Sequence, residues 1–279
     1  EIADVLMQRD DDSYLSRSAH IDGLGFATKS VTVVPSNTGR GLPAIHGAMM
    51  VFDDVEGRVE AVLDSALVTR WKTAADSVLG GRILARSEAR KLLVLGAGAV
   101  SGDLVRAYTE VFPALEGIEI WNRTPDRAVA LVLELAEEGI AVAICDDLAE
   151  SVRGSDIVAA ATMASEPIIK GEWVSAGTHV DLVGAFTPHM READDELMAK
   201  ACVFVDSRET TLNHIGELID PIANGAITEK DVLADLYDLA DGQGGRKSPE
   251  DITLFKNGGG AHLDLMTARY IMKQADRHD

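Results

Sequence analysis

The feature that most constrains the fold is a glycine-rich turn between a predicted strand and a predicted helix. The apolar run Leu92–Leu95 is followed by Gly96-Ala-Gly-Ala-Val-Ser101, which has the spacing G-x-G-x-x-S. The first glycine permits a tight turn, the second lets the backbone approach a pyrophosphate, and a small third residue allows close packing of helix on strand. The phosphates then lie at the helix N-terminus. The motif predicts dinucleotide binding rather than a purely structural turn, with these candidate contacts: Gly96, Gly98, Ala99 and Val100.

Short apolar runs alternate with helical segments from residue 91 to about residue 252. Six runs are strand candidates: Leu92–Gly96, Ile118–Trp121, Val142–Cys145, Ile157–Thr162, His179–Gly184 and Val203–Asp206. Several are apolar throughout, which is typical of strands covered on both faces. The alternation predicts the α/β fold class, with a doubly wound parallel sheet of the Rossmann type. We expect the acidic stretch 231–241 to be a solvated helix face and 242–249 to be a loop.

The segment before residue 70 is predicted to be mainly β. Three β-branched or apolar runs are separated by turn residues: Lys29–Pro35, His46–Phe52 and Val59–Leu63. Neighbouring runs with short connections indicate an antiparallel sheet. Apolar residues at spacings of three and four predict a connecting helix over 66–86, and a last helix is expected over 263–274.

The composition argues against several kinds of partner. The 279 residues include 26 Lys and Arg against 46 Asp and Glu, so the formal net charge is −20. This charge repels phosphate backbones and anionic lipid, so we expect neither a nucleic-acid partner nor a membrane partner. No run of about 18 apolar residues is present that could span a bilayer.

The two cysteines and the first residue lead to further expectations. Cys145 and Cys202 lie far apart, inside apolar runs, without the spacing of a disulfide or a metal site. They favour a cytoplasmic protein with buried thiols and without a bound metal. The chain starts at Glu1 with no methionine and no leader pattern, so we expect a native N-terminal segment to precede it.

The end of the second Rossmann strand predicts which cofactor is preferred. An NAD site usually carries an acidic residue there for the ribose 2′-hydroxyl. This chain has Asn122, Arg123 and Thr124 instead, with Arg127 one turn further on. Arginine and hydroxyl groups suit a 2′-phosphate, so NADP(H) is favoured over NAD(H). The same segment also reads as a helix start, with Thr124 as the cap and Pro125 in the first turn, and both interpretations can hold.

Other candidate residues lie at the carboxyl ends of the predicted parallel strands, where ligands bind in such sheets. Cofactor contacts are expected from the ends of the fourth and fifth strands and the following loop, namely Thr162, Asp181, Leu182, Val183 and His189. Asp206 ends the sixth strand in the same zone, and we expect it to be a helix cap. The remaining candidate histidines have no metal-ligand spacing and are expected to be structural: His46, His179 and His214.

Motifs along the whole chain resemble those of the ornithine cyclodeaminase and mu-crystallin family. The matching segments are Lys29–Asn37, Gly41–Pro43, Thr69–Ala75, Gly96–Ala99, Gly184–Pro188, Val205–Ser207, Gly216–Leu218 and Phe255–Gly260. The resemblance implies a homodimer whose subunits have two domains. Residues 1–88 and 253–279 would form a substrate-binding and dimerisation domain of the N-terminal sheet and C-terminal helix. Residues 89–252 would form the Rossmann domain.

Four residues take candidate roles from this resemblance. Lys29 matches the active-site lysine, which contacts the substrate near the reacting carbon, and Arg9 matches an arginine that binds the substrate carboxylate. Lys72 stands where most members have the arginine of an Arg-Thr-Ala-Ala motif; lysine keeps the charge but loses the planar fork. Asn257 resembles a position near the nicotinamide. The resemblance thus implies Lys29 and Lys72 as catalytic, with Arg9 beside them for substrate binding.

The chain departs from the cyclodeaminases at Phe186. In those members an aspartate at this position activates the substrate amine for ring closure. A phenyl ring can neither accept a proton nor hydrogen-bond an ammonium group, so amine activation loses its base. Reduction of a ready-made C=N bond needs no such group. The variant motifs 71–76 and 184–195 are similar to members that reduce Δ1-pyrroline-2-carboxylate.

The resemblance therefore implies an NAD(P)H-dependent reductase of a cyclic imino acid. The expected substrate is Δ1-pyrroline-2-carboxylate or Δ1-piperideine-2-carboxylate, and the product is L-proline or L-pipecolate. Three alternatives stay open: a cyclodeaminase acting on ornithine or lysine, an amino-acid dehydrogenase, and a mu-crystallin-like protein that binds NADPH and a small acid.

Overall fold

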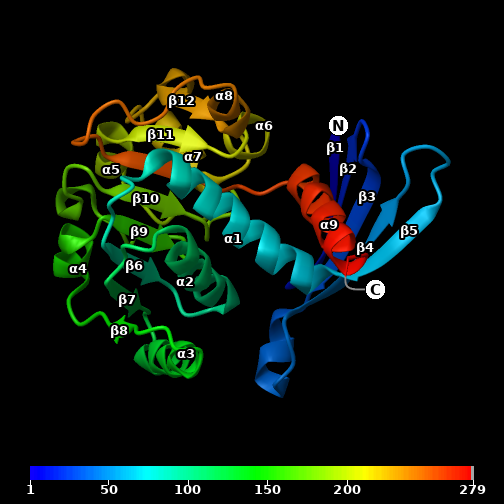
Figure 1. Ribbon diagram of the computed structural model, residues 1–279, viewed down its shortest axis with the longest axis horizontal. Coiled ribbons are helices and arrows are strands. Elements are labelled where there is room, and N and C mark those ends of the chain that lie inside the picture. Colours follow the sequence, from blue (N-terminus) through cyan, green and yellow to red (C-terminus); the bar gives the residue numbers. More distant parts are fainter. Residues whose placement is uncertain (278–279) are drawn as a thin grey trace. The chain divides into compact units, whose positions relative to one another are not determined.

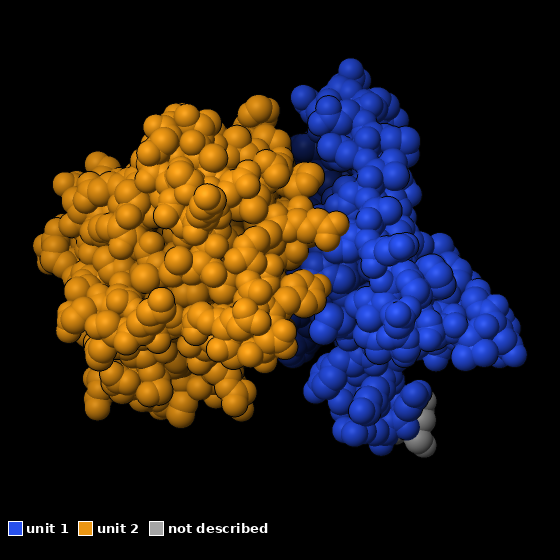
Figure 2. All heavy atoms as spheres, turned by 90° about the horizontal axis from the view of Figure 1, so that it is seen from above, with its two compact units in different colours: residues 1–72, 259–279 blue, residues 73–258 orange. Residues whose placement is uncertain are grey.

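The chain forms two compact units, coloured separately in Figure 2. The structure is a computed structural model that describes residues 1–277. Unit 1 contains residues 1–72 and the segment that begins at Gly259, and unit 2 contains residues 73–258. Helix α1 (Ser65–Leu84) begins in unit 1 and ends in unit 2.

Both unit boundaries differ from the expected ones at 88/89 and 252/253. The first lies earlier, inside α1, because the helix continues without a break from one unit into the other. The second lies later, because strand β13 (Thr253–Lys256) pairs with two strands of the parallel sheet in unit 2. That strand was expected in the other domain.

Unit 1 consists of a five-stranded antiparallel sheet in the order β1-β2-β3-β4-β5, with helix α9 (Ala261–Ala275) and the 3-10 helix η1 (Pro35–Arg40) (Figure 1). The strands are β1 (Ile2–Arg9), β2 (Asp12–Ile21), β3 (Gly25–Val33), β4 (Ile45–Phe52) and β5 (Val59–Asp64). Buried side chains of the sheet, Ala27 and Met49 among them, form one cluster with Leu265 and Ala268 of α9. The helix thus covers one face of the sheet.

The first two strands were not predicted from the sequence pattern. Strand β1 is mostly exposed, and β2 is half-buried and rich in serine, arginine and histidine. Such strands lack the apolar alternation that marks a strand in sequence, and they form because β1 pairs with β2 and β2 pairs with β3 in two hairpins.

Unit 2 is built on an eight-stranded parallel sheet in the order β12-β11-β13-β10-β9-β6-β7-β8. Besides β13, its strands are β6 (Lys91–Leu95), β7 (Gly117–Trp121), β8 (Ala143–Ile144), β9 (Ile157–Ala160), β10 (His179–Leu182), β11 (Cys202–Val205) and β12 (Val232–Asp235). The six predicted strands are all present, which confirms the α/β fold with a parallel sheet.

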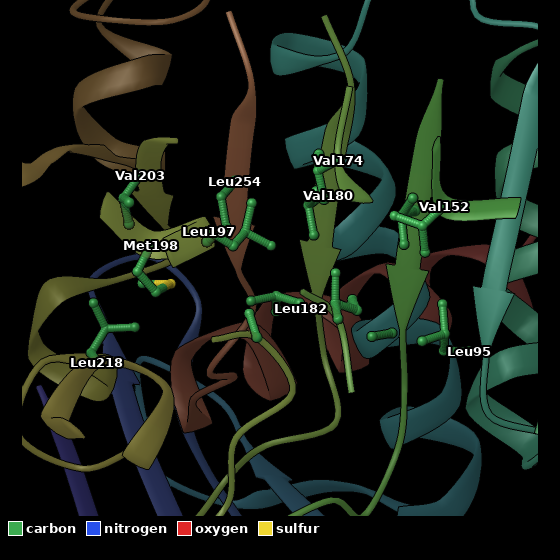
Figure 3. Packing of buried hydrophobic residues seen from close by; sticks show 14 of the residues in the cluster. Leu95, Val152, Val174, Val180, Leu182, Leu197, Met198, Val203, Leu218 and Leu254 are labelled. Atoms are coloured by element: carbon green, nitrogen blue, oxygen red, sulfur yellow. The ribbon is translucent and has the colours of Figure 1, made fainter. Parts of the chain in front are cut away.

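Helices cover both faces of this sheet. Leu93 and Leu95 belong to one apolar cluster, part of which Figure 3 shows, whereas the alternate residues Leu92 and Val94 belong to a second cluster. Besides α1, the helices of unit 2 are α2 (Ala99–Val111), α3 (Pro125–Glu137), α4 (Leu148–Gly154), α5 (Asp195–Lys200), α6 (Arg208–Thr211), α7 (Gly216–Ala223) and α8 (Leu236–Ala240), with 3-10 helices η2 (Gly171–Trp173) and η3 (Glu229–Asp231). The two clusters make the sheet doubly wound.

The acidic stretch 231–241 was wrongly expected to be a helix face. It contains the edge strand β12 followed by the five-residue helix α8. Val232 and Ala234 alternate into the interior, so the first part of the stretch has the period of a strand. No helix within residues 1–277 is long and apolar enough to cross a membrane.

Candidate functional site

The order of the parallel strands predicts a ligand-binding crevice at the end of β6. Strands β7 and β8 lie to one side of β6, and β9 and β10 lie to the other, so the order in which the parallel strands are added reverses between β6 and β9. Ligands of doubly wound sheets bind at such a point, outside the carboxyl ends of the strands. The glycine-rich turn leaves β6 here. Gly96 has φ +109°, and a Cβ on it would lie 2.5 Å from the carbonyl oxygen of Ala161, so the turn requires glycine.

The beginning of α2 fits the pyrophosphate of a dinucleotide. Gly98 is the N-cap of α2, and its helix start has no side-chain hydrogen bond that would occupy the first-turn N–H groups. A Cβ on Gly98 would meet nothing within 4 Å, so the backbone faces open space there. The hydroxyl of Ser101 is buried and has no hydrogen-bond partner within the described residues. Ala99 is exposed and Val100 half-buried at the same turn. Free N–H groups at a helix N-terminus suit an anion.

The segment after β7 carries unpaired positive charge. Helix α3 begins at Pro125, as predicted, with Thr124 as N-cap, but the Thr124 hydroxyl makes no capping bond. Instead the Asn122 amide donates to the Thr124 carbonyl oxygen at 2.8 Å and braces the turn. Arg123 and Arg127 are exposed, and neither forms an ion pair with another described residue. Both guanidinium groups are therefore available to an anion such as a 2′-phosphate.

Two of the candidates at the ends of β9 and β10 lie in accessible positions. Thr162 is half-buried in the loop after β9, and His189 is exposed in the loop after β10. The backbone N–H and hydroxyl of Thr162 both donate to Glu192 Oε1, at 2.7 and 2.8 Å. Sequence analysis did not identify Glu192, because nothing in the pattern around it distinguishes it from other acidic loop residues.

Asp181 and Leu182 lie in the interior rather than at the crevice. The Asp181 carboxylate accepts hydrogen bonds from Ser77 at 3.1 Å and from Tyr108 at 2.9 Å, and burial raises the pKa of Asp181 to about 7. The Leu182 side chain is fully buried, and the Leu182 carbonyl oxygen accepts hydrogen bonds from the Lys256 ammonium at 2.8 Å and from Asn257 N at 3.0 Å. Both residues are thus engaged in the interior, and a cofactor contact of either one stays a prediction. Val183, the next residue, is half-buried at the strand end.

Two further candidates, Asn257 and Asp206, form hydrogen bonds that connect segments within unit 2. The Asn257 amide donates to the Thr73 carbonyl oxygen and to the Ser77 hydroxyl, at 3.1 and 3.0 Å, and so fixes the loop after β13 to α1. Asp206 is not the expected helix cap, because Ser207 is the N-cap of α6. The Asp206 carboxylate instead accepts hydrogen bonds from Ser207 N and Gly258 N, at 2.7 and 2.9 Å.

Unit 1 contains a buried lysine on its helix-covered sheet face. Lys29 on β3 is 7% exposed, and its ammonium donates to Asp264 Oδ1 at 2.7 Å and to the Thr69 hydroxyl at 3.2 Å. Burial lowers the pKa of Lys29, and the positive charges of Lys72 and Arg17 lower it further, while Asp264 opposes this. Such a lysine can release a proton more readily than an exposed one.

The cations around Lys29 gather beside the glycine that precedes α9. Arg17 is directly opposite Lys29 in the β2–β3 register, so both side chains point to the same face. Lys72 is 7% exposed, and a Cβ on Gly259 would lie 2.5 Å from its ammonium nitrogen and 4.0 Å from Arg17 Nη1. Gly259 also has φ +68°, which favours glycine. Two cations, Lys72 and Arg17, thus lie beside one backbone position, an arrangement that suits a small carboxylate.

Arg9 lies away from this group. It ends β1 at the hairpin, its side chain is 81% exposed, and it pairs with Asp12. Asp4 is the β1 residue opposite Arg17, and Arg9 is five positions further along the strand, roughly 17 Å at the usual rise per residue. Arg17, rather than Arg9, therefore shares a row with Lys29.

Sequence analysis missed Arg17 and Asp264, which complete the lysine site. Arg17 lies two residues before the buried Ala19, and this spacing would place both side chains on the same face of a strand. The spacing is informative only once β2 is recognised as a strand. Asp264 lies in the first turn of the last helix, on the same side as the buried Leu265 and Ala268. A charged residue among buried helix positions is a signal for a paired charge.

The glycine-rich turn and the order of the sheet define a dinucleotide-binding Rossmann protein. The pattern of the ornithine cyclodeaminase/mu-crystallin family matches residues 6–279, and the chain belongs to this family. A Delta(1)-pyrroline-2-carboxylate reductase of Paracoccus denitrificans is 55% identical over 98% of this chain and 87% of its own length. The ketimine reductase mu-crystallin of Mus musculus is 34% identical over 88% of this chain and 74% of its own length.

Solved structures show the same relationship. The Delta(1)-pyrroline-2-carboxylate reductase of Thermococcus litoralis, in complex with NADH and L-proline, has a TM-score of 0.92 at 30% identity over 99% of this chain and 86% of its own. The iminosuccinate reductase of Paracoccus denitrificans, in complex with NAD+, has a TM-score of 0.90 at 27% identity over 100% of this chain and 85% of its own. Together with the glycine-rich turn, these relatives identify the chain as a nicotinamide-dependent oxidoreductase.

Proposed function

We propose that this enzyme reduces the C=N bond of a cyclic ketimine acid to the corresponding L-amino acid, with NADPH preferred over NADH. The substrate is Δ1-pyrroline-2-carboxylate or its six-membered homologue Δ1-piperideine-2-carboxylate, and the product is L-proline or L-pipecolate. The observation that carries the proposal is the buried Lys29, held by Asp264 and flanked by the cations Arg17 and Lys72.

The cations of unit 1 supply the binding site for the substrate carboxylate. Lys72 adjoins Gly259, and the Arg17 guanidinium lies beside it while it pairs with Asp4 at 2.8 Å. A small anion would satisfy the charge of Lys72, which forms no ion pair with another described residue. Because the overall charge is −20, this local positive group is what allows an anionic substrate to bind.

Lys29 is the proton donor in this proposal. The imine nitrogen must be protonated for the adjacent carbon to become electrophilic, and an ammonium with a lowered pKa is a suitable general acid. The Asp264 carboxylate keeps the Lys29 ammonium oriented and favours its protonated form. After the proton has passed to the ring nitrogen, the neutral Lys29 amine regains a proton from solvent.

Unit 2 binds the cofactor in the crevice at the end of β6. When bound, the reduced nicotinamide supplies a hydride. The α2 N-terminus and Gly98 receive the pyrophosphate, and the preference for NADPH rests on the exposed guanidinium groups of Arg123 and Arg127 after β7.

The residue at position 186 favours reduction over cyclodeamination. Phe186 is 58% exposed in the loop after β10 and offers no group that could take a proton from a substrate amine. A cyclodeaminase would need such a base, whereas the reductase needs only the acid that Lys29 provides.

A substrate panel tests the proposed function. Purified protein is mixed with NADPH and each ketimine, and separately with NADP+ and ornithine, lysine or alanine, while absorbance at the dihydronicotinamide band and ammonia are followed. We expect oxidation of NADPH with the ketimines. Ammonia release without net cofactor change would identify a cyclodeaminase, and tight cofactor binding without turnover of any substrate would identify a binding protein.

We also propose that two chains pair through the outer sheet face of unit 1. On the face opposite α9, the register aligns a set of exposed apolar residues, namely Val5, Met7, Phe26, Met50 and Val62. A patch of this kind on a sheet is typical of a surface that binds a second copy. Light scattering at micromolar concentration should give the mass of a dimer, and Met50→Lys should shift it toward the monomer. A compact monomer for the parent chain would contradict this assembly.

A further inference from the structure

The carboxylate of Glu192 joins the two loops that follow β9 and β10. Its Oε1 accepts the backbone N–H and the hydroxyl of Thr162, at 2.7 and 2.8 Å, and its Oε2 accepts the backbone N–H of Gly184 at 2.7 Å. The side chain is fully buried, and Glu192 lies further along the same loop as Gly184, between β10 and α5. One side chain therefore fixes the relative position of two strand ends.

The two loops touch each other at the point where Glu192 holds them. A Cβ on Gly184 would overlap the backbone oxygen and nitrogen of Thr162 and would lie 2.5 Å from Glu192 Oε1. The loops can approach so closely only with glycine at this position. The backbones of Thr162 and Gly184 thus lie against each other, and the Glu192 carboxylate accepts an N–H group from each of them.

Glu192 is in turn fixed from behind by a second buried carboxylate. Glu217 at the start of α7 accepts the backbone N–H groups of Glu192 and Ala193, at 2.8 and 2.9 Å. The Glu192 carbonyl oxygen accepts the N–H groups of Ile168 and Ile169, both at 2.9 Å. The buried ammonium of Lys256 stabilises the charge of both carboxylates, which offsets part of the cost of burying them. The rotamer and backbone of Glu192 are thus both constrained.

The loops that Glu192 joins lie on one particular side of the crevice. The 2′-phosphate candidates follow β7, and the pyrophosphate turn follows β6, so the adenosine half extends to that side. A dinucleotide spans the reversal point of the sheet, with its two halves on opposite sides. The nicotinamide half therefore falls over β9 and β10, beside Thr162 and Gly184.

We propose that Glu192 is a positioning residue for the nicotinamide half of the cofactor. It acts through Thr162 and Gly184, whose backbone edge forms the wall of that half-site, and it makes no contribution to the adenosine half. The inference concerns the cofactor site of the proposed reductase, but it rests on the dinucleotide-binding crevice rather than on the identity of the imine.

Binding measurements with whole and half cofactors test this proposal. Glu192→Gln keeps the volume of the side chain but replaces one acceptor oxygen by an NH2 group, which must face the N–H of either Thr162 or Gly184. Dissociation constants for NADPH, NADH and the adenosine-half ligands 2′,5′-ADP and 5′-AMP are measured by calorimetry. We expect NADPH and NADH to bind about 10- to 100-fold more weakly, as for a lost charge-assisted bond, and both half ligands to bind as before.

Two further variants make the result specific. Thr162→Val removes only the hydroxyl bond at 2.8 Å and should weaken NADPH binding less than Glu192→Gln does. Glu166→Gln, an exposed residue in the same part of the chain, should change nothing. Unchanged NADPH affinity in Glu192→Gln would overturn the proposal, as would a parallel loss of affinity for the half ligands, which indicates a general structural role. Because no imine is present in these measurements, failure of the proposed reaction would leave their outcome untouched.

Discussion

The ammonium nitrogen of Lys29 lies 2.7 Å from Asp264 Oδ1, and both side chains are buried. The other carboxylate oxygen, Asp264 Oδ2, has no hydrogen-bond partner within the described residues. The Asp264 carboxylate thus interacts with Lys29, and it offsets the lowering of the Lys29 pKa caused by burial and by the nearby cations. The pair can hold a proton in an apolar environment where a lone lysine would lose it.

Replacing Lys29 by methionine should abolish most of the activity. The change keeps much of the length of the side chain and removes the proton that the ring nitrogen needs, so kcat should fall by roughly 10²–10⁴-fold. NADPH affinity, measured by fluorescence titration, should be nearly unchanged, and Lys230→Met serves as an exposed control. Near-parental turnover of the ketimine by Lys29→Met would show that Lys29 is not the acid.

Replacing Asp264 by asparagine should move the pH profile toward acid. Asp264 raises the pKa of Lys29, so its neutral replacement lets that pKa fall further. In the proposed mechanism activity requires protonated Lys29 and is lost as pH rises through the Lys29 pKa, so the basic limb of the kcat/KM profile should shift to lower pH. At neutral pH kcat should fall about 10- to 100-fold, the usual effect of losing a charged hydrogen bond. A reduced rate with an unshifted basic limb would assign Asp264 a structural role only.

Arg17→Ala and Arg9→Ala form a matched pair. The register places Arg17 in the row of Lys29, whereas Arg9 is exposed at the hairpin. We expect Arg17→Ala to raise KM for the ketimine about 10- to 100-fold, because one cation of the carboxylate site is lost. Arg9→Ala should leave steady-state kinetics unchanged. The opposite ranking of the two variants would restore Arg9 as the carboxylate-binding residue.

Arg123→Ala should distinguish the two cofactors. Arg123 is exposed after β7 and has no ion-pair partner within the described residues. Its loss should weaken NADPH by roughly 1–3 kcal/mol and leave NADH binding unchanged, because only NADPH carries the 2′-phosphate. Titration of both cofactors against the same variant provides the check. Equal losses for both would mean that Arg123 does not contact a 2′-phosphate.

Asp181→Asn should flatten the pH dependence of stability. Burial raises the pKa of Asp181 from 3.8 to about 7 in the folded state. The folded state therefore holds a proton that the unfolded state releases, so stability is lost as pH rises from about 4 through about 7. An asparagine does not titrate. The unfolding free energy of Asp181→Asn should therefore fall less over this window than that of the parent, by roughly 1–4 kcal/mol. Urea unfolding at several pH values, with the exposed Asp146→Asn as control, measures the difference; parallel curves for Asp181→Asn and the parent would contradict it.

Local features of the sequence predicted the parts of the fold that local interactions determine. The turn around Gly96, the start of α3 at Pro125 and the apolar strands of the parallel sheet each have a signature within a few residues. The Gly96 turn depends on the backbone of Ala161, but its glycine spacing is characteristic by itself.

Features that depend on pairing between distant segments were missed. Strand β13 ends in Lys256, which is fully buried, and its charge is tolerated only because carboxylates from α7 and the neighbouring loops surround it. Arg17 joins Lys29 through the β2–β3 register, and Asp264 joins it across 235 positions of sequence. No pattern within a short stretch of sequence indicates these contacts between distant residues, so the lysine site could be predicted only in part.

The discontinuous composition of unit 1 has a consequence for synthesis on the ribosome. Residues 73–258, which form unit 2, are translated between the sheet of unit 1 and the helix α9 that covers it. Until α9 emerges, Lys29 lacks its counterion and the buried sheet residues lack Leu265 and Ala268. We expect unit 2 to fold before α9 has been synthesised, when unit 1 is still incomplete, since domains generally fold as units during synthesis. The proposed acid is therefore assembled last, and we expect a nascent chain stalled before α9 to bind dinucleotide without being able to protonate an imine.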